Sequence, residues 1–181
     1  MAKIWMMLLP LLLGGITLPL RSATLPDTPR SVPAADVRQT VAGIISYTRW
    51  PHLNGLPRLC IFRSADQAQV LTAAAVEHPP AVWLAIPVDD VKQALISQCD
   101  VLYFGRESSQ QQVDLINSYQ PRPLLTITEQ TPECVSGSAF CLKFINHRVS
   151  FSVNLDSLGR SGVRVHPDVL MLASSGSGRN G

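Results

Sequence analysis

Apolar and polar positions alternate along this chain in a pattern that predicts repeated strand and helix units. Val37, Val41, Ile44, Ile45 and Thr48 recur at helical spacing, which predicts an amphipathic helix from residue 34 that Pro51 ends. The later apolar runs predict strands over residues 59–62, 81–88, 99–104 and 124–128, and helices over residues 64–76, 89–97 and 107–119. Strands and helices that alternate in this way need crossover connections, which favours a mostly parallel sheet.

The last part of the chain follows a different pattern. Residues 139–145 and 148–155 predict two strands joined at Asn146-His147, which is typical of a tight hairpin. We therefore predict an α/β fold: a mostly parallel sheet flanked by helices on both faces, with a C-terminal antiparallel hairpin at one edge. Short helices are expected to begin at Asp156 and Pro167.

The two ends of the chain differ in composition from the middle. Lys3 is followed by residues 4–20 without a charge and then by the small residues Ser22 and Ala23. This order is typical of a secretory signal peptide over residues 1–23. An uncleaved membrane anchor is the alternative, although two prolines and two glycines would make a poor spanning helix. We expect a loose leader over residues 24–33, a single domain over 34–173 and a disordered Ser/Gly-rich tail over 174–181.

Charge argues against one large class of functions. The formal net charge is +2, and removal of residues 1–23 would take away Lys3 and Arg21, leaving 13 basic and 13 acidic residues. A neutral chain has no broad positive field that could hold a phosphate backbone. We therefore expect no nucleic-acid partner.

The four cysteines, Cys60, Cys99, Cys134 and Cys141, are an even number in a chain that is expected to be exported. Such a set predicts two disulfides, with three possible connectivities. A zinc site is the competing interpretation, but these spacings, with only His147 nearby, do not match the usual ligand spacing. We therefore expect no metal.

The sequence offers little for catalysis. It has no Gly-x-Ser-x-Gly elbow and no phosphate-binding loop. Residues 105–109 follow a strand and open a helix, where backbone N–H groups could hold an anion, but a turn followed by a helix cap is the favoured interpretation. The histidines are scattered in predicted turns, at His52, His78, His147 and His166. We expect a protein that is not an enzyme and has no cofactor.

Two segments carry candidates for partner binding. Tyr47, Arg49 and Trp50 lie at the expected end of the first helix, and these residue types dominate interface hot spots. Trp50 is equally well interpreted as a side chain that plugs the end of the core. The second segment, residues 154–162, contributes Leu158 and Arg160, although a helix cap is the favoured interpretation of this segment.

Several of these segments carry a resemblance to a known family. They are residues 43–51 (GIISYTRWP), 59–62 (LCIF), 103–105 (YFG), 133–134 with 137–141 (EC and GSAFC), 154–156 with 160–163 (NLD and RSGV), and 167–173 (PDVLMLA). They resemble the YfiR family in order over roughly residues 35–173. The resemblance implies a periplasmic α/β protein with two disulfides.

The same resemblance implies a function and partners. Members of the family bind the periplasmic domain of an inner-membrane diguanylate cyclase and hold the enzyme inactive, which limits cyclic di-GMP synthesis and biofilm formation. An outer-membrane lipoprotein can sequester the repressor, and a homodimer is compatible with this scheme. Two alternatives remain open: a periplasmic sensor that binds a small molecule in the crevice where the strand order reverses, and a hydrolase.

The expected sheet also suggests how the cysteines pair. If the first strand is central, the second strand lies on one side of it and the third on the other. Cys60 and Cys99 would then be on neighbouring strands, and Cys134 and Cys141 would close a small loop of their own. We expect this pairing.

Overall fold

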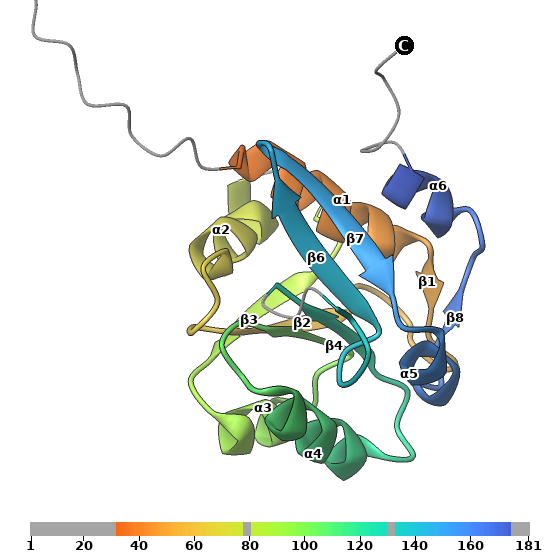
Figure 1. Ribbon diagram of the computed structural model, residues 1–181. Coiled ribbons are helices and arrows are strands. Elements are labelled where there is room, and N and C mark those ends of the chain that lie inside the picture. The colour runs from red at the N-terminus through yellow and green to blue at the C-terminus, as the bar shows by residue number, and fades with distance from the viewer. Residues whose placement is uncertain (1–31, 78–80, 130–132, 175–181) are drawn as a thin grey trace, which may run out of the picture.

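The core of the molecule is a six-stranded sheet in the order β3-β2-β4-β5-β6-β7 (Figure 1). The computed structural model describes residues 32–77, 81–129 and 133–174. The strands are β2 (Arg58–Phe62), β3 (Leu84–Val88), β4 (Val101–Phe104), β5 (Leu125–Thr128), β6 (Phe140–Ile145) and β7 (Arg148–Val153). Neighbouring strands from β3 to β6 are parallel, and β7 pairs antiparallel with β6. The predicted α/β fold, with its hairpin at one edge, is confirmed.

Helices cover both faces of this sheet. In Figure 1, α1 (Ala34–Ser46) and α2 (Ala68–Glu77) lie above the sheet, and α3 (Val91–Ser97) and α4 (Ser109–Tyr119) lie below it. Successive side chains of a strand point to opposite faces, and β2 shows the consequence. Leu59 and Ile61 pack into the core under α1, whereas Cys60 and Phe62 pack into the core against α3 and α4. The two-sided burial explains why the parallel strands read as continuous apolar runs.

The hairpin has the tight turn that its sequence predicts. Phe140 pairs with Val153 and Ile145 with Arg148, so that only two residues connect the strands. Both of them, Asn146 and His147, have a positive φ, of 49° and 61°. These are the conformations of a two-residue hairpin turn, which asparagine tolerates better than most residues.

The first helix ends earlier than its apolar stripe predicts. It stops at Ser46, and Thr48–Arg49 forms a short strand, β1, which pairs antiparallel with β8 (Arg164–Val165). Thr48 is buried, and its hydroxyl donates to the carbonyl oxygen of Ile44 at 2.8 Å. The prediction that Arg49 and Trp50 lie in the helix end is therefore wrong, because pairing with a distant segment draws the chain into an extended conformation.

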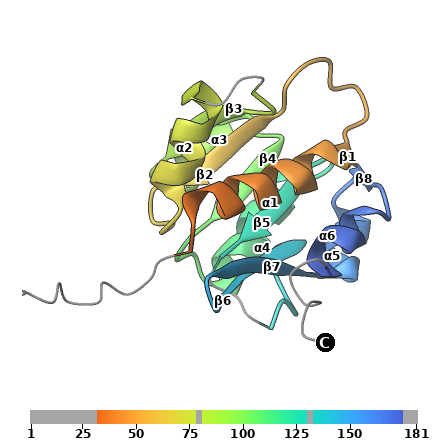
Figure 2. The same ribbon diagram turned by 90° about the horizontal axis from the view of Figure 1, so that it is seen from above.

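Two short helices and two disulfides complete the domain. The helices α5 (Leu155–Arg160) and α6 (Val169–Ser174) lie on the same side of the molecule as β1 and β8 (Figures 1 and 2). The disulfides join Cys60 to Cys99 and Cys134 to Cys141, which is the pairing expected from the strand order.

The expected signal peptide, most of the expected leader and nearly all of the expected tail lie outside the described residues. Within the described part of the chain, no helix combines the length and the apolar character that crossing a membrane would need.

Candidate functional site

The carboxyl ends of parallel strands, where the strand order reverses, are the usual place for a ligand or catalytic site in such a sheet. Here that place lies between β2 and β4. The loops that follow these strands are in direct contact: a Cβ added to Gly105 would lie 2.3 Å from the backbone N and Cα of Ala65. The backbones of the two loops are thus in contact at the crevice in which the sensor hypothesis placed a small molecule.

Glu129 follows β5 and places its carboxylate against the loop that follows β2. The side chain is buried, and it accepts hydrogen bonds from the N–H of Asp66, from the N–H of Gln67 at 3.2 Å and from the Tyr103 hydroxyl at 2.9 Å. Burial raises the pKa of Glu129 above its ordinary value, although these three donors favour the charged form. Backbone N–H groups of the kind that bind anions elsewhere are thus occupied by a carboxylate of the protein itself.

Tyr103 is the buried partner of this carboxylate. It is fully buried in β4. Burial raises the pKa of its hydroxyl well above the ordinary value, and the charge of Glu129 raises it further. The hydroxyl therefore keeps its proton at neutral pH and acts as a hydrogen-bond donor.

A second carboxylate, that of Glu107, fills the neighbouring loop. It accepts hydrogen bonds from the Gly105 N–H at 2.8 Å and from the Ser64 hydroxyl at 2.6 Å. Ser108 then begins α4 with a capping box in which its side chain and that of Gln111 exchange hydrogen bonds with the backbone. Residues 105–109 thus form the turn and cap that the sequence favours, and their glycine N–H is bonded within the protein.

Gln112 in α4 extends this network to the segment before β6. Its side-chain oxygen accepts from the Ser138 hydroxyl at 2.8 Å, and its nitrogen donates to the Glu107 carbonyl at 2.9 Å. Gln112 is fully buried, which is exceptional for this residue type and is explained by these bonds. We call the loops that carry these groups, residues 63–67 and 105–108 with Glu129, the closed edge.

The polar groups of the interior are satisfied by one another. Every buried side-chain nitrogen or oxygen in the described part of the chain has a hydrogen-bond partner. Among these residues, no group of three or more His, Cys, Asp or Glu is placed to hold a metal ion. The buried polar side chains of the closed edge therefore already have hydrogen-bond partners within the protein.

Two of the partner-binding candidates, Tyr47 and Arg49, line one groove. The groove has a volume of about 440 Å³ and lies along β1 and β8, with Arg164 and His166 on its opposite wall. The rings of Tyr47 and His166 lie 6.2 Å apart between centroids. Arg49 is exposed, and its guanidinium donates to the carbonyl oxygens of Ser46 and Thr48 at 2.6 and 2.9 Å, which holds it over the end of α1.

Trp50 faces another direction. It is half-buried against the core, and its indole N–H donates to the Asp100 carbonyl oxygen at 3.0 Å, at the amino end of β4. This contact favours the interpretation of Trp50 as a plug of the core. It separates Trp50 from the groove that Tyr47 and Arg49 share.

Leu158 and Arg160 both belong to α5. Asn154 caps this helix by accepting from the Ser157 N–H at 3.0 Å, as the favoured interpretation of the segment expects. Leu158 is half-buried against the core, whereas Arg160 is exposed and pairs with Asp156 one turn earlier. Only Arg160 of these two therefore presents most of its side chain to solvent.

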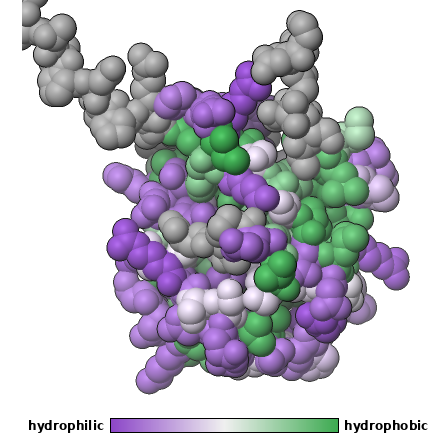
Figure 3. All heavy atoms as spheres, in the orientation of Figure 1, coloured by the Kyte–Doolittle hydropathy of each residue, from purple (hydrophilic) through white to green (hydrophobic). Residues whose placement is uncertain are grey.

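The structure adds exposed apolar residues that the sequence search missed. Leu155 in α5 and Met171 in α6 are 72% and 67% exposed, and Leu170 is 47% exposed. We call β1, β8, α5 and α6 the open side, and Figure 3 shows apolar side chains gathered there. The alternation of Val163 and Val165 with Arg164 and His166 was the sequence signal for β8, but two paired residues are too few to read as a strand.

Comparison with models of protein families identifies the family of this chain. A family model described as YfiR/HmsC-like matches residues 36–174, which is most of the chain. The match begins two residues after the start of α1 and ends with α6, so it spans both the closed edge and the open side. The resemblance drawn from the sequence is confirmed.

Proposed function

Since the chain belongs to the YfiR/HmsC-like family, we propose that it is a periplasmic regulator that binds the periplasmic domain of an inner-membrane diguanylate cyclase and holds the enzyme inactive. The observation that carries this proposal is the difference between the two regions of the molecule. The closed edge is filled by Glu129 and Glu107, whereas the open side leaves large apolar side chains in solvent. Such exposure is typical of a surface that another protein covers.

The centre of the contact is apolar in this proposal. A chain without residues 1–23 carries as many basic as acidic residues, so long-range charge contributes little to its affinity. Leu155, Leu170 and Met171 supply the apolar centre, and Arg49 and Arg160 supply charged groups at its rim. An outer-membrane lipoprotein that sequesters the repressor would compete for the same side.

The first test is made in cells that carry the intact cyclase. Deletion of the gene should raise cyclic di-GMP, and the wild-type gene should restore the low level. An unchanged level after deletion would reject the repressor assignment.

The second test locates the surface with purified protein. Met171→Asp and Leu155→Asp should each weaken binding of the cyclase periplasmic domain by about thirtyfold or more, the effect of losing a hot spot worth ~2 kcal/mol. Ile96→Asp is the matched control, because Ile96 is 71% exposed but belongs to α3, which is not part of the open side. Equal effects of all three substitutions would show that the open side is not the contact.

A small-molecule sensor is the second candidate, and the groove along β1 and β8 favours it. Arg49 and Arg164 give this groove two positive charges, against one carboxylate, that of Asp168, which lies 3.4 Å from Nδ1 of His166. The excess of positive charge suits an anionic ligand of low molecular mass. An anionic ligand should raise the unfolding temperature of the wild-type protein and raise that of Arg164→Gln less. Equal shifts in both proteins would argue against this groove as the site.

A further inference from the structure

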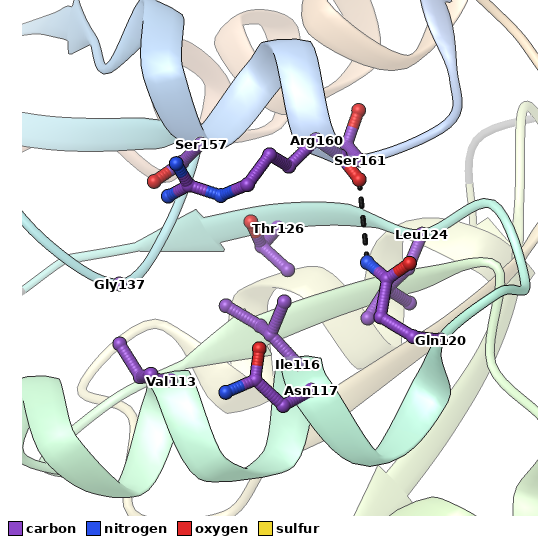
Figure 4. A pocket seen from close by; sticks show the side chains of 10 residues that line it. All are labelled: Val113, Ile116, Asn117, Gln120, Leu124, Thr126, Gly137, Ser157, Arg160 and Ser161. Atoms are coloured by element: carbon purple, nitrogen blue, oxygen red, sulfur yellow. Dashed lines mark hydrogen bonds between the residues drawn. The ribbon is translucent and has the colours of Figure 1, made fainter.

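A second groove lies between α4 and α5, and of the partner-binding candidates it includes Arg160 (Figure 4). Its volume is about 310 Å³. Val113 and Ile116 from α4 and Leu124 from the start of β5 form an aliphatic floor. A volume of this size is at the lower end of the range for small-molecule sites.

Hydrogen bonds between the two walls hold the groove in shape. The Gln120 side-chain nitrogen donates to the Arg160 carbonyl oxygen at 3.3 Å, and the Leu124 N–H donates to the Ser161 carbonyl oxygen at 2.8 Å. α4 and α5 are thus joined at one end of the groove. A ligand would enter a space that is already formed and would not need to separate the helices.

One polar side chain, that of Thr126 in β5, lies between the helices, where its hydroxyl accepts from the Ala139 N–H at 2.9 Å; the charged group is on the rim. Figure 4 shows the Arg160 side chain extended along the groove, with its guanidinium beside Ser157, and the Asn117 amide on the opposite helix. The ion pair with Asp156 uses one guanidinium nitrogen of Arg160. A guanidinium carries five N–H donors in a planar fork that matches a carboxylate. The groove therefore combines an apolar floor with one positive charge at its mouth.

We propose that this groove is a binding site for a medium-chain aliphatic carboxylate. The acyl chain lies on Val113, Ile116 and Leu124, and the carboxylate accepts from the Arg160 guanidinium. A flexible chain suits the site better than a planar ring, because none of the described residues that line the groove is aromatic. This site shares no residue with the groove along β1 and β8, but it shares Arg160 with the rim of the proposed cyclase contact.

Titration of the full-length protein with hexanoate, hexanamide and hexylamine tests both parts of the recognition. Backbone amide shifts in NMR spectra should move at α4 and α5 with hexanoate, and octanoate should bind more tightly, by up to about fourfold for each added methylene. Hexanamide should bind less tightly than hexanoate, and hexylamine least tightly. Equal affinity for all three six-carbon probes, or shifts confined to other elements, would overturn the proposal.

Substitutions at the rim of the groove test the site without changing the core. Arg160→Gln should weaken hexanoate binding by up to about fivefold, the upper range for an exposed ion pair. Asn117→Asp places a negative charge on the opposite rim and should also weaken it. Arg164→Gln, in the other groove, is the control and should leave hexanoate affinity unchanged. If only Arg164→Gln weakens binding, hexanoate occupies the groove along β1 and β8 and the proposal is wrong.

Discussion

The closed edge and the open side of this molecule differ in which side chains they bury and which they expose. In the closed edge, the carboxylates of Glu129 and Glu107 accept hydrogen bonds from backbone N–H groups of their own chain. On the open side, apolar side chains such as Leu155 and Met171 face solvent. The carboxyl ends of β2 and β4, where related folds bind ligands, are thus bonded to carboxylates of the protein itself. The open side keeps apolar side chains on its surface.

This difference separates structural from functional residues. Removal of a group in the closed edge leaves buried N–H donors without an acceptor, which costs stability. Removal of an exposed apolar side chain costs little stability. Its main effect is to lower the affinity for a partner that covers this side chain. Substitutions in the two regions should therefore have separable effects on stability and on binding.

The largest effect is expected from the disulfide that ties β2 to the segment before β4. Replacing Cys60 and Cys99 by serine removes a cross-link with a sequence separation of 39 residues, worth about 4 kcal/mol on the chain-entropy model. Replacing Cys134 and Cys141 removes one with a separation of 7, worth about 2.5 kcal/mol. Chemical denaturation of both double variants measures the difference, and a larger loss for the second pair would contradict the ranking.

The same two bonds should also differ in their resistance to reductant. Cys134 is 7% exposed, whereas Cys60, Cys99 and Cys141 have no exposed surface. Graded reduction followed by alkylation should therefore label Cys134 and Cys141 first. Earlier labelling of Cys60 and Cys99 would show that solvent exposure does not determine which disulfide is reduced first.

Gly105→Ala should open the closed edge. Its Cβ would lie 2.3 Å from backbone atoms of Ala65, which no side-chain rotation can relieve. We expect a loss of about 3 kcal/mol of unfolding free energy, the upper range for overpacking. Gly159→Ala in α5 is the matched control, because a Cβ there meets nothing within 4 Å. Similar stability of the two variants would show that the loops are less tightly packed than the structure has them.

Trp50→Ala tests whether the open side extends beyond β1 to Trp50. Trp50 is half-buried and bonded to the Asp100 carbonyl, so the variant should lose about 2 kcal/mol of stability, less than a fully buried aromatic side chain would. Cyclase binding by the protein that remains folded should be nearly unchanged. A variant with wild-type stability and weak binding would move Trp50 into the contact surface.

The smallest effect is expected at Glu129, where a substitution should change how stability depends on pH. Its pKa is raised in the folded state, so the folded protein holds this proton at a pH where the unfolded chain has released it. Stability should fall as pH rises from the unfolded pKa of about 4.3 through the raised folded value. Glu129→Gln should remove this slope, which for one proton is at most about 1.4 kcal/mol per pH unit. Parallel stability curves for the two proteins between pH 4 and 7 would contradict this explanation.

Local signals predicted most of the elements but not their boundaries. The mostly parallel sheet and the antiparallel hairpin followed from the order of apolar runs, and Asn154 caps α5 as its residue type favours. The position of β2 between β3 and β4 was an assumption, which the strand order bears out. The end of α1 was misread because the apolar stripe continues through Thr48, which is buried although it is no longer helical. Periodicity reports burial, and burial alone does not distinguish a helix from a paired strand.

The sequence by itself determined the α/β architecture, because alternating strand and helix patterns leave few ways to bury every apolar run. Only the tertiary structure decided what the two candidate regions do. Glu129 reaches an N–H more than 60 residues away, and Thr48 pairs with Val165 across the length of the domain. Neither contact has a local signal, because a single carboxylate and a two-residue strand carry no period. Only the packing of the whole chain brings these residues together. The same packing forms the closed edge and leaves the open side exposed.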